Sequence, residues 1–253
     1  ANPFAEATAV SLLDAAAVRW PRGEAIVFGD ERITFADFRA RAVELARGLA
    51  TLGIGHGDKV AVWLPNRPAW FVIQQACARL GAVVVALNPR YRSHELSYIL
   101  AQSDAVALLL TDHLGPVDYF ETLHEVLPEL AHAAPGELEA AKFPTLRHVI
   151  VDAEDPYPGC HRLGDIVGAG LLRPGPDDVF TLLYTSGTTS FPKGAMITHR
   201  NCVPHGWNCG ERLRITERDR VLHALPAPGT WGGVNIPLTT WSHGASDIQQ
   251  HAV

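Results

Sequence analysis

The sequence predicts an α/β protein, because strand-length apolar runs alternate with helix-length segments whose apolar residues recur at helical spacing. Glycine and proline fall at the borders between these segments, where turns and helix ends are expected. Of the 253 residues, 47% are hydrophobic and 19% are charged, which is typical of a folded globular protein. Alternation of this kind favours parallel strands with helices on the faces of the sheet.

Local signals set the element boundaries in the amino-terminal part. Residues 24–35 are predicted to form two short strands around a Gly29-Asp30 turn, a common hairpin signal. Thr34 is placed to cap the helix that follows, with Asp37 three residues on. The predicted order is a helix over 11–20, the hairpin over 24–35, a helix over 35–53, a strand over 58–65 and a helix over 67–81.

The alternation continues toward the carboxyl terminus and is interrupted once. Residues 131–175 are rich in Ala, Pro and Gly, which predicts a surface excursion or a subdomain junction with one strand inside it, over 147–152. The other expected elements are a strand over 82–87, a helix over 93–102, a strand over 105–112, a helical segment after Pro116 and a strand over 178–186.

Composition argues against several functional classes. The formal charge is −6, whereas nucleic-acid and membrane-surface binding both need concentrated positive charge, so we expect no nucleic-acid partner. No apolar run approaches the roughly 18 residues of a membrane-spanning helix, and the amino terminus lacks the basic start and apolar stretch of a secretory signal. The 4 cysteines are too sparse for a disulfide framework and fit a reducing compartment. We therefore expect a cytoplasmic protein with no integral membrane segment.

Four potential zinc ligands follow one another closely: His199, Cys202, His205 and Cys209. On one continuous helix this spacing would gather them on one side. Pro204 lies inside the set, however, and four ligands on one short helix cannot readily surround a metal tetrahedrally. The favoured interpretation is therefore that the cysteines are buried against the helix's neighbours and the histidines lie at its rim.

The stretch LLYTSGTTSFPKGAMITH, residues 182–199, carries the strongest chemical signal. Residues 185–190 supply five hydroxyl groups and one glycine, and Lys193 follows shortly after. The stretch is expected to link the end of a strand to a later helix, where α/β sheets bind ligands. Converging backbone N–H groups, hydroxyl donors and a mobile ammonium group together form an anion site. The sequence therefore predicts phosphate binding in this loop.

The loop does not match the P-loop of nucleoside triphosphatases. That motif needs glycine before its lysine and Ser or Thr directly after it, the latter to reach magnesium. Here Pro192 precedes Lys193 and Gly194 follows it. A P-loop enzyme is therefore disfavoured, and a polar surface turn without a ligand is the remaining plain alternative.

The string YTSGTTSFPKGAMITHRN closely resembles the phosphate-binding signature of AMP-forming acyl-CoA synthetases. These belong to the adenylate-forming superfamily, which also contains peptide-synthetase adenylation domains and luciferases. Ser190 departs from the glycine that most members carry. The resemblance covers nearly the whole chain, including the stretch from residue 33 to residue 100, with its GDKV strand and its Asn66 after a proline. It implies an α/β fold of layered sheets with flanking helices, the amino-terminal part of the family's large domain.

The resemblance also implies a two-step reaction. A carboxylic acid, fatty or aryl, attacks the α-phosphorus of ATP to give an acyl-adenylate and pyrophosphate, and coenzyme A then displaces AMP. ATP, Mg²⁺ and coenzyme A are the cofactors so implied, and a small-molecule carboxylic acid is the implied partner. No covalent catalytic nucleophile is expected. The residues implied to hold the β- and γ-phosphates are Thr185, Ser186, Gly187, Thr188, Thr189, Ser190 and Lys193.

A second segment resembles the part of the family that lines the acid pocket. In RVLHALPAPGTWGGVNIPLTTW, Pro228 and Gly229 occupy places where many members have an aromatic residue and a histidine, with Trp231 and Gly232 following. Loss of a bulky side chain would widen the pocket or leave Trp231 as its wall. The alternative is that Trp231 is a core aromatic residue.

Family members are roughly twice this length, so the resemblance places residues 1–253 in the amino-terminal part of the large domain, without the carboxyl-terminal lysine domain. A sheet cut short exposes an edge and apolar faces, so we expect association of copies, such as a homodimer, or marginal stability. Two alternatives stay open: an amino-acid adenylation domain fragment, and a non-catalytic nucleotide- or acyl-binding remnant.

Overall fold

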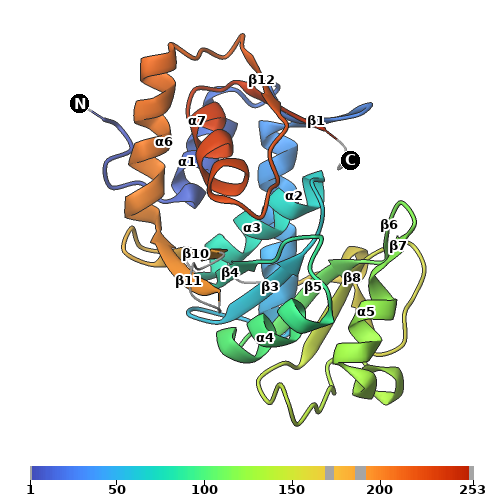
Figure 1. Ribbon diagram of the computed structural model, residues 1–253. Helices are drawn as coiled ribbons and strands as arrows, with labels where there is room; N and C mark the ends of the chain where they lie inside the picture. The colour runs from blue at the N-terminus through green and yellow to red at the C-terminus, as the bar shows by residue number, and fades with distance from the viewer. Residues whose placement is uncertain (1, 169–173, 186–191, 251–253) are drawn as a thin grey trace.

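The strands form two main sheets in the computed structural model, which describes residues 2–168, 174–185 and 192–250 (Figure 1). The larger sheet has seven strands in the order β11-β10-β4-β3-β5-β8-β9, and its pairs are parallel except for β10 with β11. Its strands are β3 (Lys59–Trp63), β4 (Val83–Ala86), β5 (Ala107–Thr111), β8 (His148–Asp152), β9 (Cys160–Arg162), β10 (Val179–Thr185) and β11 (Lys193–Thr198).

The smaller sheet joins the two ends of the chain. Its order is β12-β13-β1-β2, with β13 parallel to both of its neighbours and β1 antiparallel to β2. Its strands are β1 (Glu24–Phe28), β2 (Glu31–Thr34), β12 (Arg220–His223) and β13 (Ser246–Gln249). A separate two-stranded hairpin consists of β6 (His113–Leu114) and β7 (Val117–Asp118).

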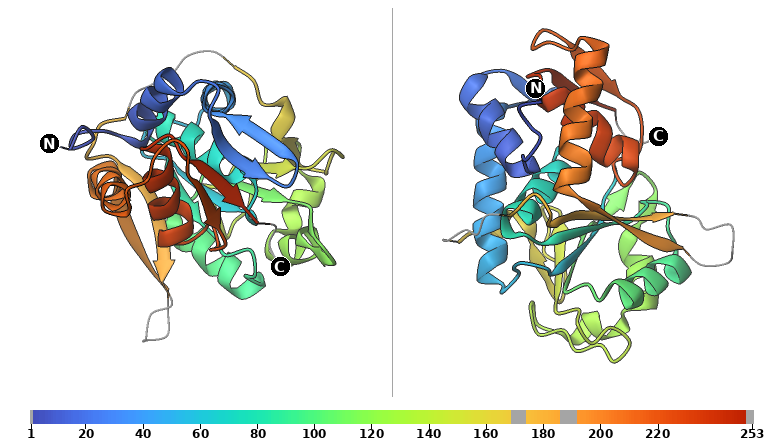
Figure 2. Two further views of the ribbon diagram at one scale, coloured as in Figure 1. Left: turned by 90° about the horizontal axis from the view of Figure 1, so that it is seen from above. Right: turned by 90° about the vertical axis from the view of Figure 1, so that its left-hand side faces the viewer.

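The helices divide between the two faces of the larger sheet (Figures 1 and 2). One apolar cluster joins α1, α2, α3 and α7 to both sheets, whereas a second cluster joins α4 and α5 to the opposite face of the larger sheet. The α-helices are α1 (Ala9–Arg19), α2 (Phe35–Thr51), α3 (Pro68–Leu80), α4 (Ser93–Ser103), α5 (Tyr119–Val126), α6 (His199–Leu213) and α7 (Ile236–Trp241). Shorter turns are η1 (Pro128–His132), η2 (Leu163–Asp165) and the π-helical η3 (Thr230–Asn235).

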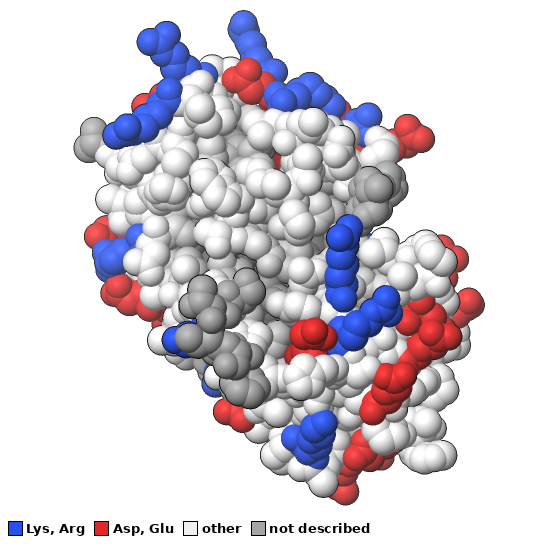
Figure 3. Space-filling view, viewed as in Figure 1, with Lys and Arg blue, Asp and Glu red and all other residues white. Residues whose placement is uncertain are grey.

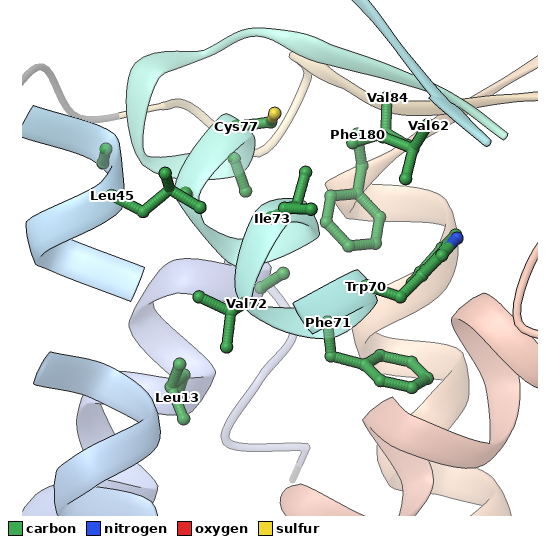
Figure 4. Packing of buried hydrophobic residues seen from close by; sticks show 14 of the residues in the cluster. Leu13, Leu45, Val62, Trp70, Phe71, Val72, Ile73, Cys77, Val84 and Phe180 are labelled. Carbon is green, nitrogen blue, oxygen red and sulfur yellow. The ribbon is translucent and has the colours of Figure 1, made fainter. Parts of the chain in front are cut away.

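Helix α3 is buried on nearly all sides, because it lies between the two sheets. Ile73 points toward Val84 and Phe180 of the larger sheet, while Val72 points toward Leu13 of α1 (Figure 4). Burial on all sides is expected at such a central position, and in α3 it includes the polar side chains of Gln74, Gln75 and Arg79. α3 therefore lies at the centre of the larger apolar cluster.

Local signals in the sequence are confirmed at several element ends. Thr34 caps α2 by accepting a hydrogen bond from the backbone N–H of Asp37. Gly81 ends α3 with a φ of 70°, in the left-handed region that glycine adopts at little cost. Gly29 turns the β1–β2 hairpin with a φ of 55°. The expected α/β class, with layered sheets and flanking helices, is confirmed.

Two features differ from the sequence-based expectation. Residues 193–198 form β11, antiparallel to β10, where a direct passage from strand to helix was expected. In addition, residues 131–168 contain β8, β9, the short turn η2 and the end of η1 rather than one strand alone. No helix in the described ranges is long and apolar enough to cross a membrane.

Candidate functional site

The predicted phosphate loop connects the two strands of a hairpin. β10 ends at Thr185 and β11 begins at Lys193, and these two residues are Cα partners across the antiparallel pair. Directly opposed residues in such a pair lie about 4.5 to 5.5 Å apart between Cα atoms. Both residues are exposed. The hairpin therefore brings the first hydroxyl and the only lysine of the predicted loop to one place.

The remaining residues of the predicted set fall in the gap between the two strands. Ser186, Gly187, Thr188, Thr189 and Ser190 lie outside the described residues. The part of the site that the structure describes thus consists of Thr185 and Lys193.

The loop end of this hairpin is held by a tyrosine. The Tyr184 hydroxyl donates a hydrogen bond to Gln102 of α4. Opposite it in the hairpin, Gly194 leaves room for the ring, because a Cβ at this position would lie 3.3 Å from Tyr184 Cζ. Burial raises the pKa of the Tyr184 hydroxyl, and the neighbouring Tyr98 and Asp104 act in the same direction. Tyr184 is therefore neutral at ordinary pH and anchors the hairpin to α4.

Helix α6 begins one residue after β11 and is firmly fixed there. Thr198 and Asn201 form a reciprocal capping box at its amino terminus. His199 is buried, and its Nδ1 accepts a hydrogen bond of 3.0 Å from the backbone N–H of Ala9. Burial lowers the pKa of His199 to about 4. A neutral imidazole thus joins α6 to the start of α1.

The four potential zinc ligands share α6 but do not converge. His199 and Cys202 point inward and are buried, whereas His205 is exposed and lies 3.6 Å from Cys209 between Nε2 and Sγ. The buried Cys202 and the exposed His205 agree with the favoured interpretation, whereas Cys209 is only half-buried and His199 is buried rather than at the rim. Within the ranges that the structure describes, no three His, Cys, Asp or Glu side chains gather as metal ligands.

The segment predicted to line the acid pocket is a tightly folded turn between β12 and α7. A Cβ at Gly232 would lie 2.0 Å from the backbone oxygen of Pro226, so only glycine fits this position without a shift of the chain. A Cβ at Gly229 would lie 3.3 Å from the same oxygen. We define the acid-side turn as residues 225–233.

Trp231 projects from the acid-side turn into solvent. Its side chain is 61% exposed, so the alternative that it is a core aromatic residue is wrong. Leu225 at the start of the turn is 44% exposed. Figure 3 shows a broad uncharged area on the face seen in Figure 1, with charged side chains of both signs toward its margins.

A buried His–Asp pair lies in β12, the strand that precedes the acid-side turn, and in β13. His223 Nδ1 lies 3.0 Å from both carboxylate oxygens of Asp247, and neither side chain is exposed. Burial raises the pKa of the Asp247 carboxyl, which is opposed in part by His223. Sequence reasoning missed this pair, because the two residues are adjacent only through the parallel pairing of the strands.

The two candidate regions are connected through α6. This helix follows β11 directly and contacts both η3 and α7. The hairpin of β10 and β11, which we call the phosphate hairpin, is therefore linked to the acid-side turn through α6.

Comparisons with known proteins point to one family. The family model described as AMP-binding enzyme matches residues 13–247. A Bacillus subtilis (strain 168) protein named as an acyl-CoA synthetase, YngI, is 36% identical over 250 residues, covering 94% of this chain and 46% of the relative. The mitochondrial medium-chain acyl-CoA ligase ACSF2 of Mus musculus is 36% identical over 253 residues, covering 92% of this chain and 41% of the relative.

Solved structures show the same arrangement of elements. The apo structure of Mycobacterium smegmatis MbtA matches with a TM-score of 0.82 and 30% identity, covering 96% of this chain and 44% of that one. The chain spans less than half the length of the curated relatives named above.

Proposed function

Because the chain belongs to the AMP-binding enzyme family, we propose that it is the amino-terminal part of a ligase that activates a carboxylic acid with ATP and transfers it to coenzyme A. The observation that carries the proposal is the hairpin that brings Thr185 and Lys193 together at the ends of a hydroxyl-rich loop. Both relatives named above are acyl-CoA synthetases or ligases by name.

A carboxylate reacts poorly with nucleophiles, and the proposed reaction converts it into an acyl-adenylate, from which AMP leaves readily. One carboxylate oxygen attacks the α-phosphorus of ATP, the bond to the bridging oxygen breaks, and pyrophosphate leaves with that electron pair. The thiolate of coenzyme A then attacks the acyl carbon, and AMP leaves, giving the thioester. Positioning and neutralisation of phosphate charge account for most of the catalysis in the first step.

In this proposal the hairpin binds the leaving pyrophosphate. Thr185, residues 186–190 and Lys193 donate hydrogen bonds to the β- and γ-phosphate oxygens. The exposure of Thr185 and Lys193 supports the role, because groups that meet a diffusing nucleotide must be accessible. The Tyr184 contact with α4 supports it too, since it fixes the end of β10 beside the loop.

We expect Mg²⁺ to bind this site together with the nucleotide, whose phosphates would supply most of its ligands. The described ranges contain no group of three carboxylate, histidine or cysteine side chains that would hold an ion by themselves. Mg²⁺ is commonly bound by substrate phosphates with few protein ligands, and hydroxyl groups of the loop are suitable additional oxygen donors. When bound, Mg²⁺ would share the charge of the pyrophosphate.

We further propose that the acid-side turn contacts the carboxylic acid, with Gly229, Trp231 and Gly232 at the pocket. The exposed indole of Trp231 is available to contact a ligand or a further part of the enzyme. Gly232 keeps the backbone close to Pro226. A fatty or aryl acid fits apolar side chains of this kind, and a cytoplasmic location fits free coenzyme A and ATP.

The test is acid-dependent exchange of labelled pyrophosphate into ATP by the native gene product, with acetate, butyrate, octanoate, palmitate, benzoate and amino acids. Exchange with a fatty or aryl acid, followed by thioester formation with coenzyme A, is the expected result. Exchange with amino acids alone would instead indicate an adenylation domain. Nucleotide binding without exchange would contradict the proposal and favour a non-catalytic remnant.

A further inference from the structure

Three side chains at four-residue spacing face the acid-side turn from α3 and the residues before it. Asn66 precedes the helix, and its amide bonds the turn twice: Nδ2 donates to the Leu225 oxygen at 2.9 Å, and Oδ1 accepts from the Ala227 N–H at 2.7 Å. Both ends of one amide are thus used on two backbone groups about 160 residues away in sequence. Such pairing fixes both position and orientation of the turn.

Further along α3, Trp70 and Gln74 hold the other end of the turn. Gln74 Nε2 donates a buried hydrogen bond of 2.9 Å to the Gly233 oxygen. A Cβ at Gly233 would lie 2.9 Å from Trp70 Cη2, so the backbone packs directly against the indole ring. The labelled Trp70 lies at the amino-terminal end of α3 in Figure 4. We call Asn66, Trp70 and Gln74 the α3 row.

The acid-side turn has two sides. One side is held by the α3 row, and the other is exposed. The row holds backbone atoms of Leu225, Ala227 and Gly233, and Ala227 is fully buried. The indole of Trp231 projects from the same segment and is exposed. The position of the indole therefore depends on how α3 holds the backbone beneath it.

We infer that the α3 row is a specificity device: it positions the acid-side turn and thereby sets which carboxylic acid the enzyme selects. The inference rests on the proposed function for the identity of the ligand. It assigns Asn66 and Gln74 as positioning residues, which act on the acid through the turn and do not touch it. Small displacements of a pocket wall change the fit of one acid relative to another, and one methylene contact alone accounts for about 10- to 200-fold discrimination.

Gln74 has a matched control in its neighbour, Gln75. Both glutamines are buried in α3, but the Gln75 amide has no hydrogen-bond partner in the described part of the chain. Replacing either with leucine removes one amide and keeps a side chain of similar size. Only Gln74→Leu removes a contact to the turn. An effect seen in Gln74→Leu and not in Gln75→Leu is therefore due to loss of that contact and not to the loss of a polar group from α3.

The experiment measures two quantities on the native gene product and both variants. The first is the ratio of kcat/KM for octanoate and acetate, obtained from acid-dependent pyrophosphate exchange. We expect Gln74→Leu to change this ratio by about two- to tenfold, corresponding to loss of one hydrogen bond, and Gln75→Leu to leave it unchanged. The second is hydrogen exchange of the backbone amides in residues 225–235, which should accelerate only in Gln74→Leu. Asn66→Asp, which keeps one acceptor and loses the donor, gives a second route if Gln74→Leu does not fold.

The outcomes separate this inference from the proposed function. An unchanged ratio in both Gln74→Leu and Asn66→Asp would overturn the selectivity role of the row, whatever the amide exchange shows, while leaving acid activation intact. Absence of pyrophosphate exchange with every acid in the unaltered protein would overturn the proposed function and the selectivity claim with it. In that case faster amide exchange in Gln74→Leu alone would still support the row as the support of the turn.

Discussion

The phosphate hairpin and the acid-side turn are built on opposite principles. Thr185 and Lys193 are exposed at the tips of two paired strands. The acid-side turn, in contrast, is tightly packed against its own backbone at Gly232 and bonded to α3 through Asn66. Binding phosphate needs accessible donors and charge, whereas distinguishing one acid from another needs a wall that does not move. The difference predicts that substitutions in the hairpin alter ligand binding with little effect on stability, while those in the turn lower stability as well.

The largest effect is expected for Gly232→Ala. The added Cβ would lie 2.0 Å from the Pro226 oxygen, and backbone cannot move aside as a flexible side chain can. We expect a loss of about 3 kcal/mol in the free energy of unfolding, measured by urea denaturation.

Gly194→Ala in the hairpin is the matched comparison, because its Cβ would meet the Tyr184 ring at 3.3 Å. A cost below about 1 kcal/mol is expected there, since a neighbour must give way by only a few tenths of an ångström. If Gly232→Ala and Gly194→Ala lowered the free energy of unfolding equally, the turn would not be more tightly packed than the hairpin, and the comparison would be contradicted.

The next effect is a loss of stability in acid through His199, at the start of the helix that links the two regions. The folded protein holds the pKa of His199 at about 4 by burial, whereas the unfolded chain binds a proton near the ordinary value of about 6.5. The unfolded state therefore binds more protons in this window, and stability falls as the pH drops from about 6.5 to about 4, by about 2 to 3 kcal/mol.

Unfolding measured at several pH values for the unaltered chain and for His199→Asn isolates this contribution. Asparagine offers an oxygen acceptor to the Ala9 N–H but does not titrate in this range. Since burial also lowers the pKa values of His148 and His161, both proteins should lose stability in acid, with the smaller slope in His199→Asn. Identical slopes would contradict a buried, neutral His199.

A smaller effect is expected for Thr198→Ala. This change removes the capping oxygen that accepts from the Asn201 N–H, which should cost about 1 kcal/mol in thermal or urea unfolding. Because α6 contacts η3 as well as following β11, hydrogen exchange should increase on both sides of the link. An increase confined to the first turn of α6 would show that the two regions are not coupled through this helix.

The sequence was sufficient for elements that carry their own signals. The Thr34 cap, the Gly81 helix end and the strand of residues 179–185 all follow from short patterns that are independent of distant partners. The match to the family was likewise predicted from the loop string.

Features that depend on distant pairing were not predictable in this way. β11 has four exposed residues in succession and no alternating apolar pattern, so its strand conformation comes from pairing with β10. The His223–Asp247 pair and the bonds from Asn66 and Gln74 to the acid-side turn also depend on which strands and helices become neighbours. Trp231 could be assigned as core or surface only once its exposure was known.

The most direct test of the account is pyrophosphate exchange by Lys193→Ala in the native gene product, beside Lys142→Ala as a control. Lys142 is also an exposed lysine, and it lies over the Phe143 ring, so both variants lose the same charge. We expect Lys193→Ala to lower the exchange rate by about ten- to a hundredfold, equivalent to about 1.5 to 3 kcal/mol, with unfolding free energy unchanged within about 0.5 kcal/mol. Lys142→Ala should leave both quantities unchanged. An undiminished rate in Lys193→Ala would contradict the assignment of the hairpin as the phosphate site.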